Sequence, residues 1–366
     1  MTLIPLEKPE DFLLAEQFLL PHEETCASLA SLVRRKSDKL IIISDSECPV
    51  VECPHSGCIE TTDTSTNSPV VEWPRSGCIE TTESQKSVVS IRPSAYSTTG
   101  VLGILNLDST IYHCIPDPAL LDADLLKKEL PYLMKKPVKC ISGEKAATEF
   151  LIEVFNSVNG GFDTAATQPL NHPGIIYPYT MMRWLSASEA GVSKPPQSKV
   201  VSTLRLSSGT VRPSDYSTTG TTLSGGEEII RCTEHDMEIL HPLQKDYMKE
   251  EVAVPGRAIT DAEVDITLRN ILKNQLCFAL TVDGDIVAKA NTNAIGINCV
   301  QIGGVYTPPL YRRNGFAGAL VTALSNRALR SGKEPVLFVK EKNTPAFNLY
   351  QKLGFEECGR YCIAYY

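Results

Sequence analysis

The chain has 366 residues, with 42% hydrophobic and 21% charged residues and a formal net charge of −8. This length accommodates about two or three globular domains, and the apolar content is ordinary for them. The acidic balance argues against a general nucleic-acid binder, which needs a basic surface to meet phosphates. The longest uninterrupted apolar stretches are only as long as a strand, far short of the roughly 18 residues of a membrane span.

The N-terminus and the cysteines bear on the compartment. The first residues, MTLIPLEKPEDFLL, contain acids and prolines where an export signal has a basic segment and then an apolar one. The 12 cysteines are scattered through apolar segments such as YHCI and VKCI. This distribution favours reduced, buried thiols over a disulfide framework, so we expect a cytoplasmic protein.

Residues 1–160 show an α/β pattern once a polar insertion is set aside. Hydrophobic periodicity and turn signals define its elements. In chain order we predict a helix at Glu10–Leu20 that continues toward Arg34, strands at Lys39–Ile43, Val101–Leu107 and Thr110–Ile115, a helix at Ala119–Met134, a strand at Val138–Ile141 and a helix at Glu144–Val158.

Two polar regions, at about residues 44–90 and 161–226, interrupt the α/β patterns. The first contains a tandem repeat, in which PVVECPHSGCIETT (Pro49–Thr62) returns as PVVEWPRSGCIETT (Pro69–Thr82). Two copies are too few for a solenoid, which needs about three units to bury a continuous core. We therefore predict a polar surface insertion at 44–90 and a Ser/Thr/Pro/Gly-rich linker or insertion at 161–226.

A cluster of potential metal ligands lies in the first insertion, at Cys48, Cys53, His55 and Cys58. Their spacing is C-x4-C-x4-C rather than the tight CxxC pairs of structural zinc sites. The second copy of the repeat replaces Cys48, Cys53 and His55 by Ser, Trp and Arg. We predict that the protein binds no metal.

Residues 227–366 show a second α/β pattern, with the order β-α-α-β-β-β-α-β-α-β. The dipeptide Asp283-Gly284 between two apolar alternations is a hairpin signal. We predict strands at Glu227–Cys232, Gln275–Val282, Ile286–Asn291, Cys299–Tyr306, Pro335–Lys340 and Gly359–Tyr366, and helices at Glu234–Glu250, Asp261–Lys273, Phe316–Arg330 and Pro345–Leu353.

The segment RRNGFA (Arg312–Ala317) lies where a strand is followed by the helix Phe316–Arg330. The first N–H groups of a helix have no partner within the helix, and together with the helix dipole they attract an anion. Gly315 allows close approach of the backbone, and Arg312 and Arg313 add positive charge. A pyrophosphate fits this arrangement.

This segment also fits the R/Q-x-x-G-x-G/A signature of the GCN5-related N-acetyltransferases (GNAT). About 30 residues further on, NTPAFNLYQKLGF (Asn343–Phe355) resembles the second motif of that family. The resemblance covers residues 227–366 and implies an acyl-CoA N-acyltransferase fold, which is an α/β fold with a mixed, mostly antiparallel sheet flanked by helices. One departure is the arginine at 313, where the family more often has glycine.

The resemblance also implies roles for individual residues, with acetyl-CoA as cosubstrate. Tyr350 would protonate the departing thiolate, as a phenol with a pKa near 10 can. Asn343 would bond the pantetheine arm. The remaining cofactor contacts would come from backbone groups of Val305, Tyr306 and Thr307 and from a pyrophosphate cradle at Arg312, Arg313, Asn314, Gly315, Phe316, Ala317 and Gly318.

The acceptor side is less specific. Glu250 and Glu251, at the end of the first helix of this half, are candidates for holding or deprotonating an amine, and exposed helix-end carboxylates are the open alternative. His241 precedes a proline, and we interpret it as structural. Three polar residues could meet the substrate or belong to a loop: Asn291, Thr292 and Asn293.

The first half resembles a degenerate acetyltransferase domain. Its segment KKPVKCISGEKAATEFLIEVF is similar to a pyrophosphate region, but SGEKAA lacks the arginine. We therefore predict a degenerate GNAT-like domain at 1–160 that shapes the acceptor cleft, the linker at 161–226 and a catalytic domain at 227–366. Two-domain bacterial members of the family look similar.

The resemblance implies an acetyl-CoA-dependent N-acetyltransferase that transfers the acetyl group directly to an amine. The sequence leaves the acceptor open between a small amine, an amino acid, an antibiotic and a protein lysine, and it leaves a homodimer open. We expect no nucleic-acid or membrane partner. The alternative function is a non-catalytic coenzyme A-binding sensor or scaffold.

Overall fold

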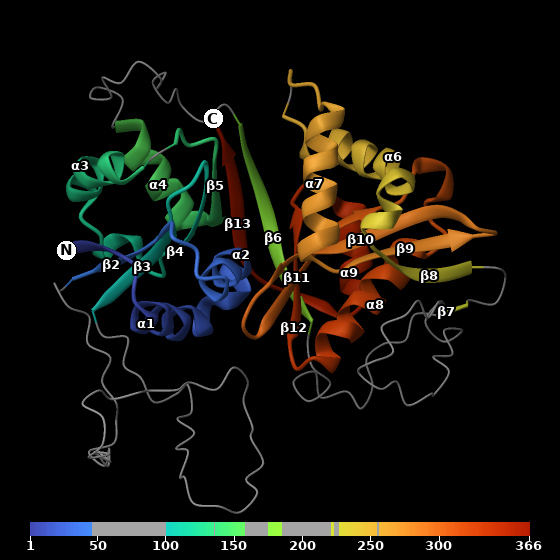
Figure 1. The fold of residues 1–366 in the computed structure, drawn as a ribbon, viewed down its shortest axis with the longest axis horizontal. Helices are drawn as coiled ribbons and strands as arrows, with labels where there is room; N and C mark the ends of the chain where they lie inside the picture. Colours follow the sequence, from blue (N-terminus) through green and yellow to red (C-terminus); the bar gives the residue numbers. More distant parts are fainter. Residues whose placement is uncertain (46–99, 135, 158–174, 185–220, 223–226, 255) are drawn as a thin grey trace, which may run out of the picture.

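The structure is a computed structural model that describes residues 1–45, 100–134, 136–157, 175–184, 221–222, 227–254 and 256–366. In this described part, thirteen strands form one mixed sheet, in the order β1-β2-β3-β4-β5-β13-β6-β12-β11-β10-β9-β8-β7 (Figure 1). The predicted insertion from residue 46 onward, with its repeats and its four candidate metal ligands, lies outside the described residues.

The first half contains β1 (Thr2–Pro5), α1 (Pro9–Leu19), α2 (Glu23–Arg34), β2 (Leu40–Ser44), β3 (Val101–Asn106), β4 (Thr110–Cys114), α3 (Ala123–Leu133), β5 (Cys140–Glu144), α4 (Lys145–Ser157) and β6 (Ile175–Trp184). The elements predicted up to residue 158 are confirmed within a few residues at their ends, except that the first helix does not continue unbroken toward Arg34: a 3-10 turn at Leu20–His22, which contains Pro21, separates α1 from α2. The short strand β1 was not predicted, because four half-exposed residues at a sheet edge show no periodicity.

The second half contains β7 (Thr221–Thr222), β8 (Glu227–Cys232), α6 (Met237–Tyr247), α7 (Asp261–Asn274), β9 (Cys277–Val282), β10 (Asp285–Ile295), β11 (Cys299–Tyr306), α8 (Phe316–Arg330), β12 (Glu334–Lys340), α9 (Thr344–Lys352) and β13 (Phe355–Tyr365). A π-helical turn, η5 (Met248–Val252), extends α6. The predicted order β-α-α-β-β-β-α-β-α-β is confirmed from β8 to β13.

The prediction of a linker throughout 161–226 is wrong for residues 175–184. These residues form β6, which pairs antiparallel with β12 on one side and with β13 on the other. Met181 and Met182, in the middle of β6, are buried. The sequence signal was missed because ten residues with an internal proline, flanked by Ser/Thr/Pro/Gly-rich sequence, do not stand out as a strand.

The same order of elements occurs twice, and the last strands are exchanged between the two halves. The order β1-α1-α2-β2-β3-β4-α3-β5-α4-β6 returns as β8-α6-α7-β9-β10-β11-α8-β12-α9-β13. Both halves contain a parallel pair, β4–β5 and β11–β12. However, β6 pairs with β12 of the second half, and β13 pairs with β5 of the first half. The two halves therefore share one sheet (Figure 1).

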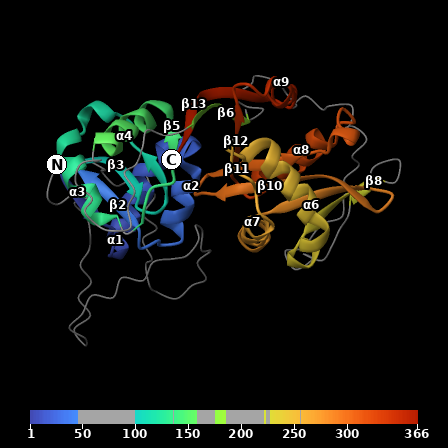
Figure 2. The same cartoon turned by 90° about the horizontal axis from the view of Figure 1, so that it is seen from above.

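The second half has helices on both faces of its part of the sheet. On β9, Ala279 packs with residues of α6 and α7, whereas the next residue, Leu280, packs with residues of α8. Since successive side chains of a strand point to opposite faces, α6 and α7 cover one face and α8 covers the other. Figure 2 shows α6 and α7 on one side of β10 and α8 on the other.

Helix α2 of the first half packs against the β10–β11 hairpin of the second half. The buried carboxylate of Glu23 accepts N–H bonds from Ile297, Asn298 (2.8 Å) and Cys299 (3.3 Å) in the hairpin turn. Arg34 at the end of α2 donates to the carbonyl oxygen of Gly296 at 2.6 Å. These charge-assisted bonds hold the hairpin against the first half.

Three further observations concern the described residues only. None of their helices is both long and apolar enough to cross a membrane. None of their His, Cys, Asp and Glu side chains form a group that could hold a metal ion. The eight cysteines among them are free thiols, and seven of these are buried.

Candidate active site

A cleft of about 830 Å³ lies beside the ends of β11 and β12. The two parallel strands pair from Cys299–Glu334 to Ile302–Leu337, and their pairing ends there. The cleft gathers all of the residues predicted for catalysis or cofactor binding except one: Glu250, Glu251, Val305, Tyr306, Thr307, Arg312, Arg313, Gly315, Phe316, Ala317, Gly318, Asn343 and Tyr350. The exception, Asn314, lies in the same loop, and its side chain donates to the carbonyl oxygen of Tyr311 at 3.1 Å. Of the three polar residues left open for the substrate, all lie in β10 rather than in a loop, and Asn293 lines the cleft whereas Asn291 and Thr292 do not.

The N-terminus of α8 opens into this cleft. Its N-cap is Gly315, with a φ of 84°, and no side chain caps the first N–H groups of the helix. These N–H groups are therefore available to an anion. Arg313 has a φ of 67°, a left-handed conformation that favours glycine, which accounts for the glycine usual at this position in the family that the motif resembles.

Arg312 links two walls of the cleft. Its Nη2 lies 2.7 Å and 2.8 Å from the two carboxylate oxygens of Glu250 in η5, and its Nε donates to the carbonyl oxygen of Thr307 at 2.8 Å. The side chains of Arg312 and Glu250 are 42% and 44% exposed. An incoming phosphate would therefore compete with Glu250 for the guanidinium.

Glu251 makes contacts with two neighbouring side chains, which a freely exposed carboxylate at a helix end would not make. Its Oε1 accepts from Asn343 Nδ2 at 3.2 Å, and its Oε2 lies 3.5 Å from Lys340 Nζ. Lys340 is 7% exposed and also donates to the backbone oxygen of Glu251. Burial lowers the pKa of Lys340, and the Glu251 carboxylate opposes this shift. Asn343 is also the N-cap of α9, because its Oδ1 accepts from Ala346 N at 3.2 Å.

Tyr350 on α9 is buried, and its ring packs edge-on against Phe355 with centroids 6.1 Å apart. Burial raises the pKa of Tyr350 above its ordinary value, because desolvation disfavours the phenolate. The hydroxyl therefore keeps its proton at neutral pH. The sequence placed Tyr350 and Asn343 on one helix face, and both side chains line the same cleft.

Sequence reasoning missed the aromatic wall of the cleft. Tyr179 of β6 and Ile363 of β13 line it, and they come from the two exchanged strands. Tyr247 and Phe338 line it as well, and burial raises the pKa of Tyr247 to about 12. A sequence signal exists in the alternating aromatic residues of IIYPYTMM and RYCIAYY, but it does not show that these strands reach the cleft.

The corresponding place in the first half is closed. By element order α3 corresponds to α8 and α4 to α9, so the comparison of SGEKAA, at the start of α4, with a pyrophosphate region is wrong in position. At the start of α3, the carboxylate of the N-cap, Asp122, accepts the N–H groups of Asp124 and Leu125, each at 3.0 Å. Over β5, the ring of His113 occupies the space beside Gly143 and bonds Thr148 Oγ1 at 2.7 Å. That the first half does not bind the cofactor stays a prediction.

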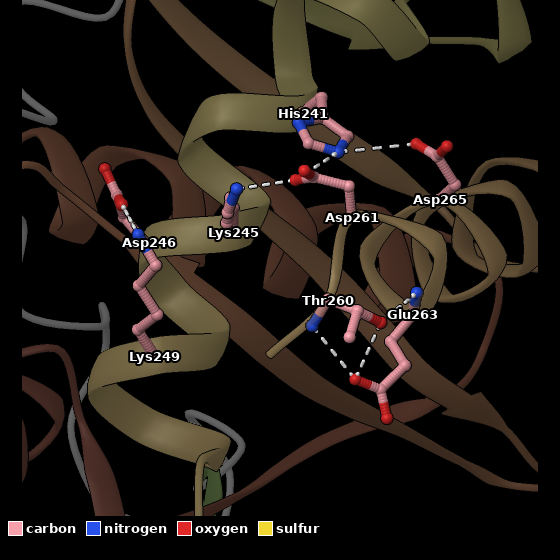
Figure 3. A network of polar contacts seen from close by, with 8 residues as sticks. All are labelled: His241, Lys245, Asp246, Lys249, Thr260, Asp261, Glu263 and Asp265. Atoms are coloured by element: carbon pink, nitrogen blue, oxygen red, sulfur yellow. Dashed lines mark hydrogen bonds and ion pairs between the residues drawn. The ribbon is translucent and has the colours of Figure 1, made fainter. Parts of the chain in front are cut away.

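His241 lies on α6, facing Asp261 and Asp265 of α7 (Figure 3), and it is not among the residues that line the cleft. Its Nε2 is 3.4 Å from Asp265 and 3.7 Å from Asp261 in α7. Lys245 Nζ lies 2.6 Å from the same Asp261. These contacts tie α6 to α7, which agrees with the structural interpretation of His241.

A comparison of the sequence with protein families finds that the model of the family FR47-like protein matches residues 285–363. This family is related to the GNAT acetyltransferases. The match runs from β10 to β13, and it includes the start of α8, Asn343 and Tyr350. Residues 285–363 therefore match a GNAT-related family model, and the resemblance seen in the two motifs is confirmed.

Three solved structures illustrate what the chain is similar to. A protein from Novosphingobium aromaticivorans described as a GNAT-family acetyltransferase is 18% identical over 52% of this chain, with a TM-score of 0.34. This chain covers 64% of that protein, which is less than two thirds of its length. An acetyltransferase of the GNAT family from Colwellia psychrerythraea is 10% identical over 74% of this chain and 82% of its own, with a TM-score of 0.40.

The third structure, described as an acetyltransferase from Clostridium acetobutylicum with acetyl-CoA, is 22% identical over 36% of this chain and 91% of its own. Its TM-score is 0.31. No curated protein matches the chain. Because these identities and TM-scores are low, we take neither substrate nor mechanism from these structures.

Proposed function

We propose that the protein is an acetyl-CoA-dependent N-acetyltransferase that transfers the acetyl group directly to an amine. One observation carries the proposal: a single cleft unites the uncapped N-terminus of α8, flanked by Arg312 and Arg313, with the buried and protonated phenol of Tyr350. An anion site and a general acid in one cleft fit a substrate with a diphosphate at one end and a leaving thiolate at the other.

Each wall of the cleft has a part in holding the cofactor. The first N–H groups of α8 and the two arginines would bind the diphosphate of coenzyme A. Backbone groups of Val305 to Thr307, at the end of β11, would bond the pantetheine arm and the carbonyl oxygen of the thioester. One N–H of the Asn343 side-chain amide donates to Glu251 and its oxygen accepts from Ala346 N, which leaves the second N–H for the pantetheine.

In the proposed reaction, the amine nitrogen attacks the carbonyl carbon of the thioester, and a backbone N–H of β11 stabilises the resulting oxyanion. The C–S bond then breaks, and Tyr350 gives its proton to the departing sulfur. The proton lost by the amine passes to Glu250, to Glu251 or to water. Among the described residues that line the cleft none is a cysteine, in keeping with transfer in a ternary complex.

The test is the release of free coenzyme A thiol from acetyl-CoA, measured with a panel of small amines, amino acids and lysine peptides and with a reaction that lacks amine. We expect amine-dependent thiol release with at least one class, and an acetylated product of matching mass. Binding of acetyl-CoA without turnover across the panel would favour the alternative of a coenzyme A-binding sensor or scaffold. Absence of acetyl-CoA binding would overturn both functions.

A further inference from the structure

Lys289 is a fully buried lysine on β10, and none of its described hydrogen bonds is to a carboxylate. Its side chain is 0% exposed, and its Nζ donates to the carbonyl oxygen of Gly304 at 2.9 Å and to Asn291 Oδ1 at 3.3 Å. The ring of Tyr247 lies beneath it, 4.9 Å from Nζ to the centroid. Burial lowers the pKa of Lys289. A lysine is costly to bury without a carboxylate, so its contacts require an explanation.

The acceptor of its shorter bond, Gly304, lies in a β-bulge of β11. The register with β10 shifts between the pairs Lys289–Tyr306 and Asn291–Gly303, so β11 has one extra residue there. Gly304 has a φ of 57°, and any side chain on it would collide with Asn291. Lys289 and Asn291 therefore pack directly against the bulge and hold its shape.

The bulge also lines the cleft, through Gly303, Gly304 and Val305. The peptide that links Gly304 to Val305 is trans, so its N–H points away from the carbonyl that Lys289 binds. Val305 lines the cleft, beyond the last β11–β12 pair at Ile302. A hydrogen bond to the carbonyl of a peptide polarises the whole group and makes its N–H a stronger donor.

We propose that Lys289 is a positioning residue for the transfer reaction, which holds the β11 bulge and polarises the Gly304–Val305 peptide so that the Val305 N–H binds the thioester carbonyl oxygen. This inference rests on the proposed function. The N–H bond strengthens as negative charge develops on the carbonyl oxygen, so Lys289 acts on the transition state more than on cofactor binding.

The test compares wild-type protein with Lys289→Met, which keeps the size of the side chain and removes its donors. Infrared spectra of bound acetyl-CoA, labelled with ¹³C at the carbonyl, report the hydrogen bond to the carbonyl oxygen without any acceptor amine. We expect the carbonyl band to move toward the position of free acetyl-CoA. We also expect a Kd for acetyl-CoA within about three-fold and a kcat lowered by about ten- to a hundred-fold.

The matched control is Lys333→Met. Lys333 also donates to backbone carbonyls of this hairpin, at Gly296 (2.8 Å) and Ile297, but at the end remote from the cleft. The Lys333→Met variant should have the wild-type carbonyl band, the wild-type Kd for acetyl-CoA and the wild-type kcat. If Lys289→Met does not fold, Lys289→Gln, which keeps an N–H donor of shorter reach, should give a partial shift of the band.

The inference would be overturned if the folded Lys289→Met variant bound acetyl-CoA with a wild-type carbonyl band and had a wild-type kcat. If the Lys289→Met variant does not fold, the same result in the folded Lys289→Gln variant would overturn it. Equal effects of Lys289→Met and Lys333→Met on the band would reduce Lys289 to a structural role. Failure of the wild-type protein to bind acetyl-CoA would instead refute the proposed function, and the inference with it.

Discussion

Arg312 and Glu250 form a two-point ion pair between the loop before α8 and the end of α6, with Nη2 2.7 Å and 2.8 Å from the two carboxylate oxygens. The pair occupies the guanidinium that the diphosphate of coenzyme A would need. Because both side chains are about half exposed, the pair is worth only about 1 kcal/mol or less. A dianion that also reaches the α8 N–H groups can displace Glu250.

Glu250→Gln should therefore strengthen coenzyme A binding by about two- to five-fold, since it removes a competitor for Arg312. Calorimetry at low salt measures the change, which should shrink at high salt because screening weakens exposed pairs. Asp246→Asn is the matched control, because Asp246 lies on α6, one turn before Glu250, pairs with Lys249 and is not among the residues that line the cleft. Unchanged or weaker binding in Glu250→Gln would mean that Arg312 does not meet the diphosphate.

Reversing both charges, with Arg312→Glu and Arg313→Glu together, should weaken acetyl-CoA binding by on the order of ten-fold or more, since two carboxylates would then face the diphosphate. The same reversal at Arg327 and Arg330, at the other end of α8, changes the net charge equally and leaves the cleft intact. It should leave affinity within about two-fold. Equal losses in the two double variants would place the diphosphate elsewhere.

Tyr350→Phe should leave acetyl-CoA affinity unchanged and lower kcat by about ten- to a thousand-fold, because it removes the proposed proton donor and keeps the ring against Phe355. The measurement needs a true acceptor amine and conditions in which chemistry limits the rate. Phe347→Leu, on the same helix outside the cleft lining, controls for perturbation of α9. Wild-type turnover in the Tyr350→Phe variant would mean that Tyr350 does not donate the proton and only packs in the core.

Because His113 is buried, we expect the protein to lose stability at acidic pH. Burial lowers the pKa of His113 to about 3, whereas an unfolded histidine titrates near 6.5. Between these values the unfolded chain binds a proton that the native protein excludes, so stability is lost as the pH falls below about 6.5. By pH 5 the loss should reach about 2 kcal/mol. Urea unfolding from pH 7 to pH 5 measures it.

The acid-dependent loss should largely disappear in His113→Gln, whose amide can still bond Thr148. His235→Gln, at an exposed histidine, should keep the wild-type slope. A wild-type slope in folded His113→Gln would assign the acid sensitivity to other groups.

Glu23→Gln should destabilise the protein by about 2 kcal/mol, because the buried carboxylate accepts three backbone N–H bonds and an amide would turn a donor toward at least one of them. The free energy of unfolding measures the loss. Glu24→Gln, which alters the half-exposed partner of Arg183, should cost less than about 1 kcal/mol. Equal losses of unfolding free energy in the two variants would mean that the hydrogen bonds from Glu23 to the hairpin stabilise the protein no more than an exposed ion pair does.

Local features of the sequence determined much of the second half. Three local patterns predicted this region: β-branched and aromatic residues before Arg312 indicated a strand, Gly315 a turn at a helix start, and the apolar face after it the helix α8. Such patterns can be read from the sequence because capping and periodicity act within about one or two helical turns. The same local rules placed Asn343 at the start of α9 and Tyr350 within it. The residues assigned to the cofactor by resemblance, Asn314 excepted, therefore meet in one cleft, and their contact with a cofactor stays a prediction.

Only the tertiary structure decided which strands complete each half. β6 and β13 have similar patterns of aromatic and aliphatic residues, and no local sequence feature specifies that β6 pairs with β12 rather than with β5 of its own half. That choice depends on packing between residues far apart in the sequence, such as the buried contact of Tyr361 with Ser142. For the same reason the sequence did not show that the aromatic residues reach the cleft, and the Arg312–Glu250 pair and the bond from Lys289 to Gly304 had no sequence signal. Each joins side chains through the fold, and no rule of spacing along the chain reports such contacts.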